Sequence, residues 1–153
     1  MIPPAIVYPT LPAMTDEQID KVRRLEEKFQ EMPQRPIATH HLLHGGMYAR
    51  TITIPAGVAI TGALVEVATV LIVNGDCLVF VGDETVSVNG YLVIPGSKGR
   101  KQVFLAKTDT DLTVIFPTQA KTVTEAEKEF TKEAERLGSR QHADLDTFII
   151  TGE

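Results

Sequence analysis

Three of the four histidines of this chain lie close together, in the stretch THHLLHGG at positions 39–46. Neutral imidazoles are common metal ligands, so His40, His41 and His44 are the first candidates for a metal site. A metal centre needs three or four converging donors with partners of their own. Histidines within one turn do not complete such a centre, although a carboxylate from another subunit could do so.

The direction of the three imidazoles depends on the backbone that carries them. His40 and His44 share a face of either a helical turn or a strand, whereas His41 leaves that face in a strand. We favour a local structural role, in which the imidazoles hydrogen-bond to a strand edge. A metal-linked or pH-linked subunit contact is the alternative, and catalysis is the least favoured role.

The composition is that of an ordinary soluble domain. The chain has 153 residues, of which 43% are apolar and 23% are charged. This length predicts one domain with modest extensions. The net charge of −5 argues against non-specific binding of nucleic acid, which needs a basic face. No apolar run approaches the roughly 18 residues of a membrane span, so we expect no membrane partner.

The N-terminal region combines prolines with apolar side chains. Residues 1–14 contain four prolines, which favour an extended arm over a folded element. The arm is too apolar for a solvated tail, and we expect it to lie on its own barrel or on a neighbouring subunit through Ile2, Ile6, Tyr8 and Leu11. Residues 15–32 follow as a helix, which begins with the capping box T-x-x-Q formed by Thr15 and Gln18.

Residues 47–117 consist of short β-branched runs separated by turns that contain Gly, Asn and Pro. Strands at this spacing predict an antiparallel sandwich or barrel. Residues 124–137 are predicted to form a second helix, capped by Thr124 and Glu127, with most of its surface in water. The tail, with Phe148, Ile149 and Ile150, predicts one more strand that is added to a sheet edge.

The stretches IPAG (54–57), VLIVNGD (70–76), VNGYLVIPGSKG (88–99) and FPT (116–118) occur in the order and spacing of the two cupin motifs. From about residue 39 to 118 the chain resembles the cupin superfamily of small jelly-roll barrels. The combination of HH, GGMYAR and IPAG is similar to cupin-like proteins carried by tailed bacteriophages. The resemblance divides the chain into an arm and helix (1–36), a cupin-like barrel (37–120) and a C-terminal helix and tail (121–153).

The resemblance also implies where a metal would bind, because cupin enzymes hold a divalent ion with histidines and a carboxylate from the two motifs. Ala63, Val65 or Val67 stand where the first histidines would fall, and Arg100 or Lys101 stand near the last. Apolar side chains and cations offer no lone pair to a metal. We therefore expect a barrel without metal or other cofactor. The loop 96–101 has three cations and two glycines and could cradle an anion, but it does not precede a helix, so we favour a solvated turn.

Two functions follow as hypotheses. The first is a non-catalytic virion protein of a tailed phage, most simply a capsid decoration (cement) protein. It would form a homo-oligomer, a trimer or a dimer, and would contact other virion proteins such as the major capsid protein. Its arm would act together with the tail residues Phe148, Ile149 and Ile150.

The second hypothesis is a cupin that binds a small molecule or is an enzyme with an atypical site. Glu66, Arg100 and Lys101 would be its polar groups. The direction of Arg100 and Lys101 separates the two hypotheses, because charges that point into an apolar barrel mark a ligand site. A phage-encoded regulator of a host protein is a third possibility.

Overall fold

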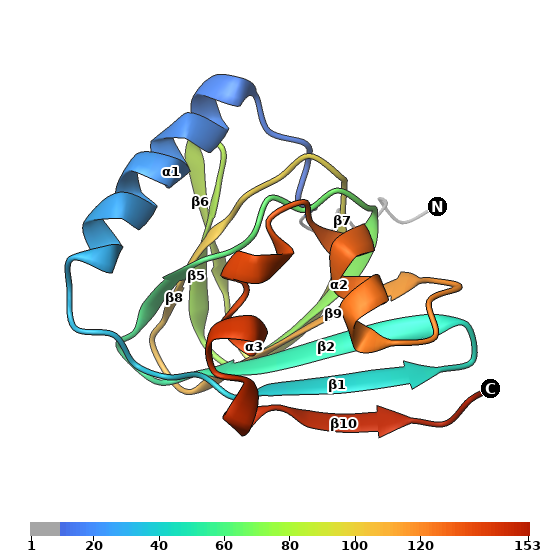
Figure 1. Ribbon diagram of the computed structural model, residues 1–153. Coiled ribbons are helices and arrows are strands. Elements are labelled where there is room, and N and C mark those ends of the chain that lie inside the picture. Colours follow the sequence, from blue (N-terminus) through green and yellow to red (C-terminus); the bar gives the residue numbers. More distant parts are fainter. Residues whose placement is uncertain (1–9) are drawn as a thin grey trace, which may run out of the picture.

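The structure is a computed structural model, and it describes residues 10–153 (Figure 1). The predicted arm contacts Ile2, Ile6 and Tyr8 lie outside the described residues. The strands are β1 (Thr39–His44), β2 (Met47–Ile54), β3 (Ala59–Thr61), β4 (Thr69–Asn74), β5 (Cys77–Val81), β6 (Glu84–Val88), β7 (Tyr91–Gly96), β8 (Val103–Ala106), β9 (Thr110–Pro117) and β10 (Thr147–Ile150). The helices are α1 (Asp16–Gln30), α2 (Val123–Phe130) and α3 (Gly138–Gln141), with single 3₁₀ turns η1 (Ala134–Arg136) and η2 (Ala143–Leu145).

Strands β2 to β9 are arranged as a jelly roll. The larger sheet has the order β10-β1-β2-β9-β4-β7, and the smaller sheet has the order β3-β8-β5-β6. The antiparallel pairs that form the jelly-roll ribbon are β2 with β9, β3 with β8, β4 with β7 and β5 with β6. One long antiparallel ribbon therefore folds over itself around the β5–β6 hairpin, which is the jelly-roll topology. The prediction of a mainly β jelly roll with helices near both ends is confirmed.

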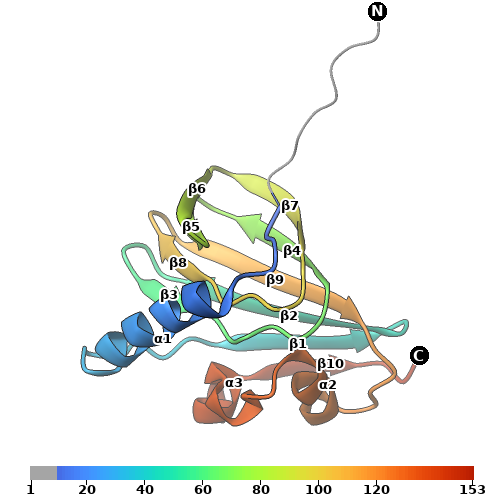
Figure 2. The same ribbon diagram turned by 90° about the horizontal axis from the view of Figure 1, so that it is seen from above.

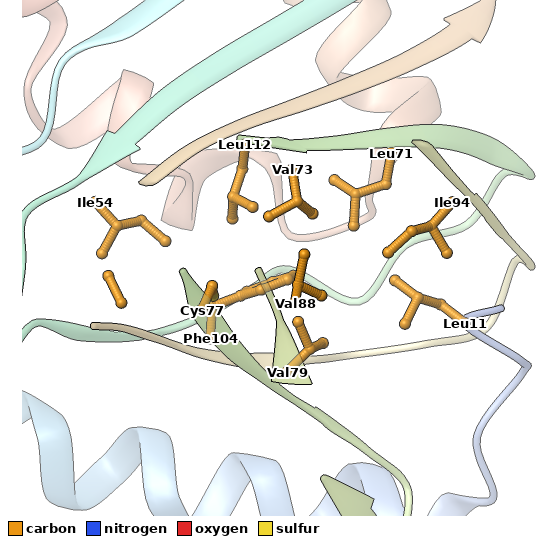
Figure 3. Close-up of a cluster of buried hydrophobic side chains, with 11 residues drawn as sticks. Leu11, Ile54, Leu71, Val73, Cys77, Val79, Val88, Ile94, Phe104 and Leu112 are labelled. Atoms are coloured by element: carbon orange, nitrogen blue, oxygen red, sulfur yellow. The ribbon is translucent and has the colours of Figure 1, made fainter. Parts of the chain in front are cut away.

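The main core lies between the two sheets (Figure 3). Alternate residues of a strand point to the same face, so each strand contributes every second side chain. Leu71 and Val73 of β4 and Ile94 of β7 face Val79 and Cys77 of β5. Cys77 is completely buried, and this burial raises the pKa of its thiol.

Helix α1 covers the outer side of the four-stranded sheet (Figures 2 and 3). The predicted capping box is present, because Thr15 Oγ1 accepts from the amide of Gln18 and the Gln18 side chain accepts from the amide of Thr15. Near its end, Glu26 accepts a hydrogen bond from Thr61 of β3, and near its start Lys21 lies 3.6 Å from Asp83 in the β5–β6 turn. These partners stand at opposite edges of the small sheet, so α1 crosses all of it.

The C-terminal segment differs from the single helix predicted for residues 124–137. Helix α2 begins one residue earlier and is capped by Thr122, whose Oγ1 accepts from the amide of Glu125. It ends at Phe130, because Thr131 has extended backbone, and the chain continues through η1 and α3. Glu127, predicted as a capping residue, is buried in an ion-pair network. Tertiary contacts therefore override the local capping signal.

Helix α2 and the turn η1 cover the end of the large sheet that the small sheet leaves open (Figure 2). Phe130, Ala134 and Leu137 are all buried there against Tyr48 and Phe116. Seven of residues 124–137 are exposed and seven are buried or half-buried, so less of this segment faces water than predicted. Within residues 10–153, no helix is long and apolar enough to cross a membrane.

Both predicted extensions reach the barrel. Leu11 is buried and forms a parallel bridge with Gly96 of β7, so this part of the arm lies on its own barrel. The tail forms β10, which pairs in parallel with β1 at the edge of the large sheet (Figure 1). Phe148, Ile149 and Ile150 remain 54%, 63% and 53% exposed.

Candidate functional site

A cavity of about 390 Å³ opens between the two sheets, at the end where α1 approaches the C-terminal segment. Its size falls within the range of small-molecule sites. Both sheets, α1 and the C-terminal segment contribute residues to its wall. The apolar part of its lining includes Ile52, Ile60, Leu71, Phe104, Leu112 and Val114. The charged part includes Glu26, Arg50, Arg100, Lys101 and Glu133.

Arg100 is a buried cation in the wall of this cavity. It is 2% exposed, and it donates to the carbonyl oxygen of Ser97 at 2.5 Å and to Thr69 Oγ1 at 2.7 Å. Within residues 10–153, no carboxylate forms an ion pair with it. Burial alone lowers the pKa of Arg100 to about 10. The prediction of a solvated turn is therefore wrong at Arg100, which is an uncompensated positive charge inside the barrel.

The backbone beside Arg100 is shaped to receive its side chain. Gly96 leaves open the space where the guanidinium lies, because a Cβ atom at residue 96 would stand 2.6 Å from the Arg100 Cζ. The same residue pairs with Leu11, which closes the strand edge behind it. The arm and the loop together hold the guanidinium at a fixed position.

Lys101 is also buried, but its charge is compensated. The side chain is 1% exposed, and its Nζ donates to the carbonyl oxygen of Gly62 at 2.8 Å and to Glu26 Oε2 at 2.9 Å. Glu133 Oε2 lies 3.7 Å from the same nitrogen. Burial by itself would raise the pKa of Glu133, but the hydrogen bond from Arg23 and the charge of Lys101 lower it. Lys101 therefore ties α1 to the C-terminal segment.

Arg50 of β2 lines the cavity from the large sheet. Its Nη1 donates to Glu127 Oε2 and to Ser139 Oγ, each at 3.0 Å. Glu127 also accepts from Arg140 Nε at 2.6 Å and from the hydroxyl of Ser139. Burial would raise the pKa of Glu127, but the hydrogen bonds from Ser139 and Arg140 and the charge of Arg50 lower it. In this network the single carboxylate of Glu127 pairs with the guanidinium groups of both Arg50 and Arg140.

The first strand places the three histidines on opposite faces, as the strand geometry predicts. His40 and His44 point outward, and their Nδ1 atoms contact the hydroxyls of Thr147 and Thr151, the latter at 2.8 Å. Four residues of strand separate them by about 13 Å, which is too far for one metal ion. Their observed contacts join β1 to the tail.

His41 points inward and is 2% exposed. Its ring stacks on Phe148 at 4.9 Å, its Nδ1 lies 2.6 Å from the hydroxyl of Tyr48, and its Nε2 lies 3.6 Å from Asp146 Oδ1. The Asp146 carboxylate facing Nε2 can only accept, so it favours the tautomer in which Nδ1 accepts from the Tyr48 hydroxyl. The proton of the neutral imidazole then sits on Nε2 and faces Asp146. His41 thus connects the tail to the Arg50 network.

The burial of His41 predicts a pH dependence of stability. Burial and the charge of Arg50 lower the pKa of His41 below its ordinary 6.5. The unfolded chain therefore binds a proton that the folded chain does not, and the free energy of unfolding decreases as the pH falls below about 6.5. Burial raises the pKa of Asp146 above 3.8, so the contribution of Asp146 has the opposite sign and decreases as the pH rises.

We expect urea unfolding to show lower stability at pH 5.5 than at pH 7.5. In His41→Gln this decrease should be smaller, by up to about 1.4 kcal/mol per pH unit. His44→Gln makes the same substitution at an exposed histidine of the same strand and is the control for the loss of an imidazole as such. Parallel pH profiles of the wild type and His41→Gln would show that His41 does not titrate on unfolding.

The cupin metal positions are apolar in this barrel. Ala63 and Val65 line the cavity, whereas Glu66 does not, so the prediction of Glu66 as a ligand-facing group is wrong. Its backbone amide instead donates to the carbonyl oxygen of Phe130. Among residues 10–153, no group of three or more His, Cys, Asp and Glu side chains is placed to hold a metal ion. The absence of a cofactor stays a prediction.

Sequence reasoning missed Arg50, Glu127 and Glu26 as parts of the site. A signal for Arg50 was available, because Tyr48, Arg50, Ile52 and Ile54 alternate along one strand and share its buried face. A charge on such a face requires a buried partner. No comparable signal identifies Glu127 or Glu26, which lie on helices rich in exposed carboxylates.

No family model matches the sequence, and no curated protein matches it. Solved structures of similar shape include a cupin-2 domain protein from Shewanella frigidimarina, with 17% identity, a TM-score of 0.41, and coverage of 61% of this chain and 91% of that one. A cupin-2 domain protein from Rhodospirillum rubrum has 15% identity, a TM-score of 0.49, and coverage of 60% of this chain and 66% of that one.

A third similar structure is salicylate 1,2-dioxygenase from Pseudoaminobacter salicylatoxidans, with 16% identity and a TM-score of 0.45. The match covers 65% of this chain but only 31% of the dioxygenase. All three similarities concern the fold alone. The jelly-roll barrel predicted from the cupin motifs is present, and the narrower likeness to phage-borne proteins stays a prediction.

Proposed function

We propose that this protein binds a small organic anion in the cavity between its sheets. The observation that carries the proposal is Arg100, a buried guanidinium in the cavity wall for which residues 10–153 supply no carboxylate. An unpaired buried charge is costly, and a ligand carboxylate would remove most of that cost. Of the two functions predicted from the sequence, inward-pointing Arg100 and Lys101 favour the ligand-binding one.

The remaining lining indicates the rest of the ligand. Leu71, Leu112 and Phe104 offer an apolar wall, while the neighbouring cations Arg50 and Lys101 are already paired with carboxylates. A ligand with one negative group and an apolar body would fill the cavity without disturbing those pairs. Of the buried cations Arg50, Arg100 and Lys101, none would be left free to pair with a second acidic group on the ligand.

The proposal is tested with hexanoate and hexan-1-ol, which share a chain and differ in charge. We expect hexanoate to bind with a Kd below about 1 mM and the alcohol at least about tenfold more weakly, as measured by titration calorimetry. Methyl resonances of Leu71 and Leu112 should shift on binding. Equal affinities, or shifts confined to the outer surface, would contradict an anion site in the barrel.

Catalysis and the virion role are separate matters. The prediction that the chain is not an enzyme remains a prediction, because a binding cavity is compatible with either answer. Capsid decoration also remains a proposal, supported by the resemblance and by the exposure of Phe148, Ile149 and Ile150. Its test is detection of the protein on purified particles. The tail and the cavity are different surfaces, so ligand binding does not argue against assembly.

A further inference from the structure

The outward face of the large sheet has a composition unlike that of the rest of the chain. Its outward positions alternate with the core positions of β1, β2, β4, β7 and β9 and continue onto β10. Among them only Asp111 carries a formal charge, whereas 23% of the whole chain is charged. A solvated sheet face is normally polar, so this face is atypical.

One row of this face is apolar across all six strands. The registers bring the following residues side by side in this order: Ile149, Leu42, Ala49, Ile115, Val70 and Pro95. In the next row Ile72 neighbours Val93. Leu42, Val70 and Val93 are 38%, 43% and 46% exposed, so nothing within residues 10–153 covers them. We name the outward positions of the large sheet the apolar face.

The threonines, Asp111 and His40 of the apolar face are paired within it. Thr51 and Thr113 share a hydrogen bond of 2.8 Å, and Thr53 donates to Asp111 Oδ1 at 2.6 Å. His40 contacts Thr147 of β10. Groups that are already paired lose little when water is removed. The face can therefore be dehydrated by a partner at low cost.

We infer that the apolar face packs against the same face of a second copy, as a two-fold symmetric dimer. The partner must be flat and neutral, because a charge placed on this face would be buried without a counter-charge. The same face of another copy is flat, and its one formal charge, on Asp111, is already hydrogen-bonded by Thr53. Two such sheets pack face to face about 10 Å apart. A two-fold axis makes such a contact self-complementary and closed.

The size of the apolar face supports a stable dimer. Six strands at about 4.8 Å spacing and about 13–27 Å length present roughly 600 Å² of flat area. Side-chain relief raises the accessible area toward the roughly 800 Å² per partner of a standard interface. Helix α1 lies across the corresponding face of the small sheet, from Thr61 to Asp83, so that face is not a flat surface (Figure 2).

Sedimentation velocity of the full chain between about 1 and 300 µM tests this dimer. We expect a monomer–dimer equilibrium for the wild type. Val70→Lys should weaken dimerisation by about 100-fold, because it places a lysine in the neutral interface. Met32→Lys adds the same charge at a 58% exposed site after α1 and should dimerise like the wild type. Val70→Thr keeps a β-branched side chain and is the test variant if Val70→Lys fails to fold. It is expected to dimerise more weakly than the wild type.

Several results would overturn the inference. A wild type that stays monomeric throughout the concentration range would do so, as would a trimer, which an isologous two-fold contact cannot form. The same holds if folded Val70→Lys or Val70→Thr dimerises with the wild-type constant. Dimerisation that survives both substitutions but is lost when residues 1–9 are removed would assign assembly to the arm instead.

Discussion

Glu127→Ala is expected to lower the free energy of unfolding by about 3–5 kcal/mol, as for other buried ion pairs that lose one partner. The Glu127 side chain is 3% exposed and is bound to Arg50 and Arg140. Its removal leaves Arg50, with a side chain 9% exposed, without a counter-charge beside the apolar cluster of Tyr48 and Phe130. Urea unfolding at pH 7 measures the loss.

Two further variants separate charge from packing at this position. Glu127→Gln keeps the shape of the side chain but removes its charge. It should lower the free energy of unfolding almost as much as Glu127→Ala, because Arg50 is again without a counter-charge. Glu135→Ala removes an exposed carboxylate from the same C-terminal segment and should change stability by less than about 0.5 kcal/mol. If Glu127→Ala is no more destabilising than Glu135→Ala, the buried network contributes nothing to stability.

Arg100→Met is expected to abolish anion binding while leaving the fold at least as stable as the wild type. Methionine replaces a buried cation that has no carboxylate partner in residues 10–153, so its removal eliminates a desolvation cost. The lost charge-assisted hydrogen bond should weaken hexanoate binding by at least about 2 kcal/mol, or thirtyfold. Calorimetric titration and urea unfolding of the same sample measure both effects.

The matched control for Arg100→Met lies in the same loop. Lys98 is exposed, so Lys98→Met removes a nearby positive charge without touching the cavity, and it should leave hexanoate affinity unchanged. Arg100→Lys keeps the charge but loses the planar fork, and intermediate affinity is expected. A large loss of stability in Arg100→Met would instead identify the hydrogen bonds to Ser97 and Thr69 as structural, and equal affinity would remove Arg100 from the site.

Arg50 and Arg100 are both buried cations, but they have opposite roles. Arg50 is compensated by Glu127, so it contributes to stability and its partner is indispensable. Arg100 is left uncompensated beside a cavity, so the proposed ligand supplies its partner. Both residues lie on inward positions of the jelly roll, and only their neighbours in space distinguish them.

The sequence alone determined the parts of this protein that depend on neighbouring residues. The capping box of α1 joins Thr15 to Gln18, three positions apart, and alternating apolar residues define the buried faces of the strands. The direction of His41 follows from the same two-residue period. The cupin-like order of turns and strands identified the jelly roll, because turn residues and strand spacing together limit the topologies available.

Only the tertiary structure decided which charges are buried and what compensates them. Arg50 meets Glu127 from 77 positions away, and Arg100 meets Thr69 from 31 positions away. The loop 96–101 has the composition of a solvated turn, yet α1 and the arm cover Lys101 and Arg100. Burial of a charge depends on long-range packing and not on local pattern. The sequence named Arg100 and Lys101 as candidate ligand groups, but only the folded chain shows that Lys101 is compensated and that Arg100 has no carboxylate partner within residues 10–153.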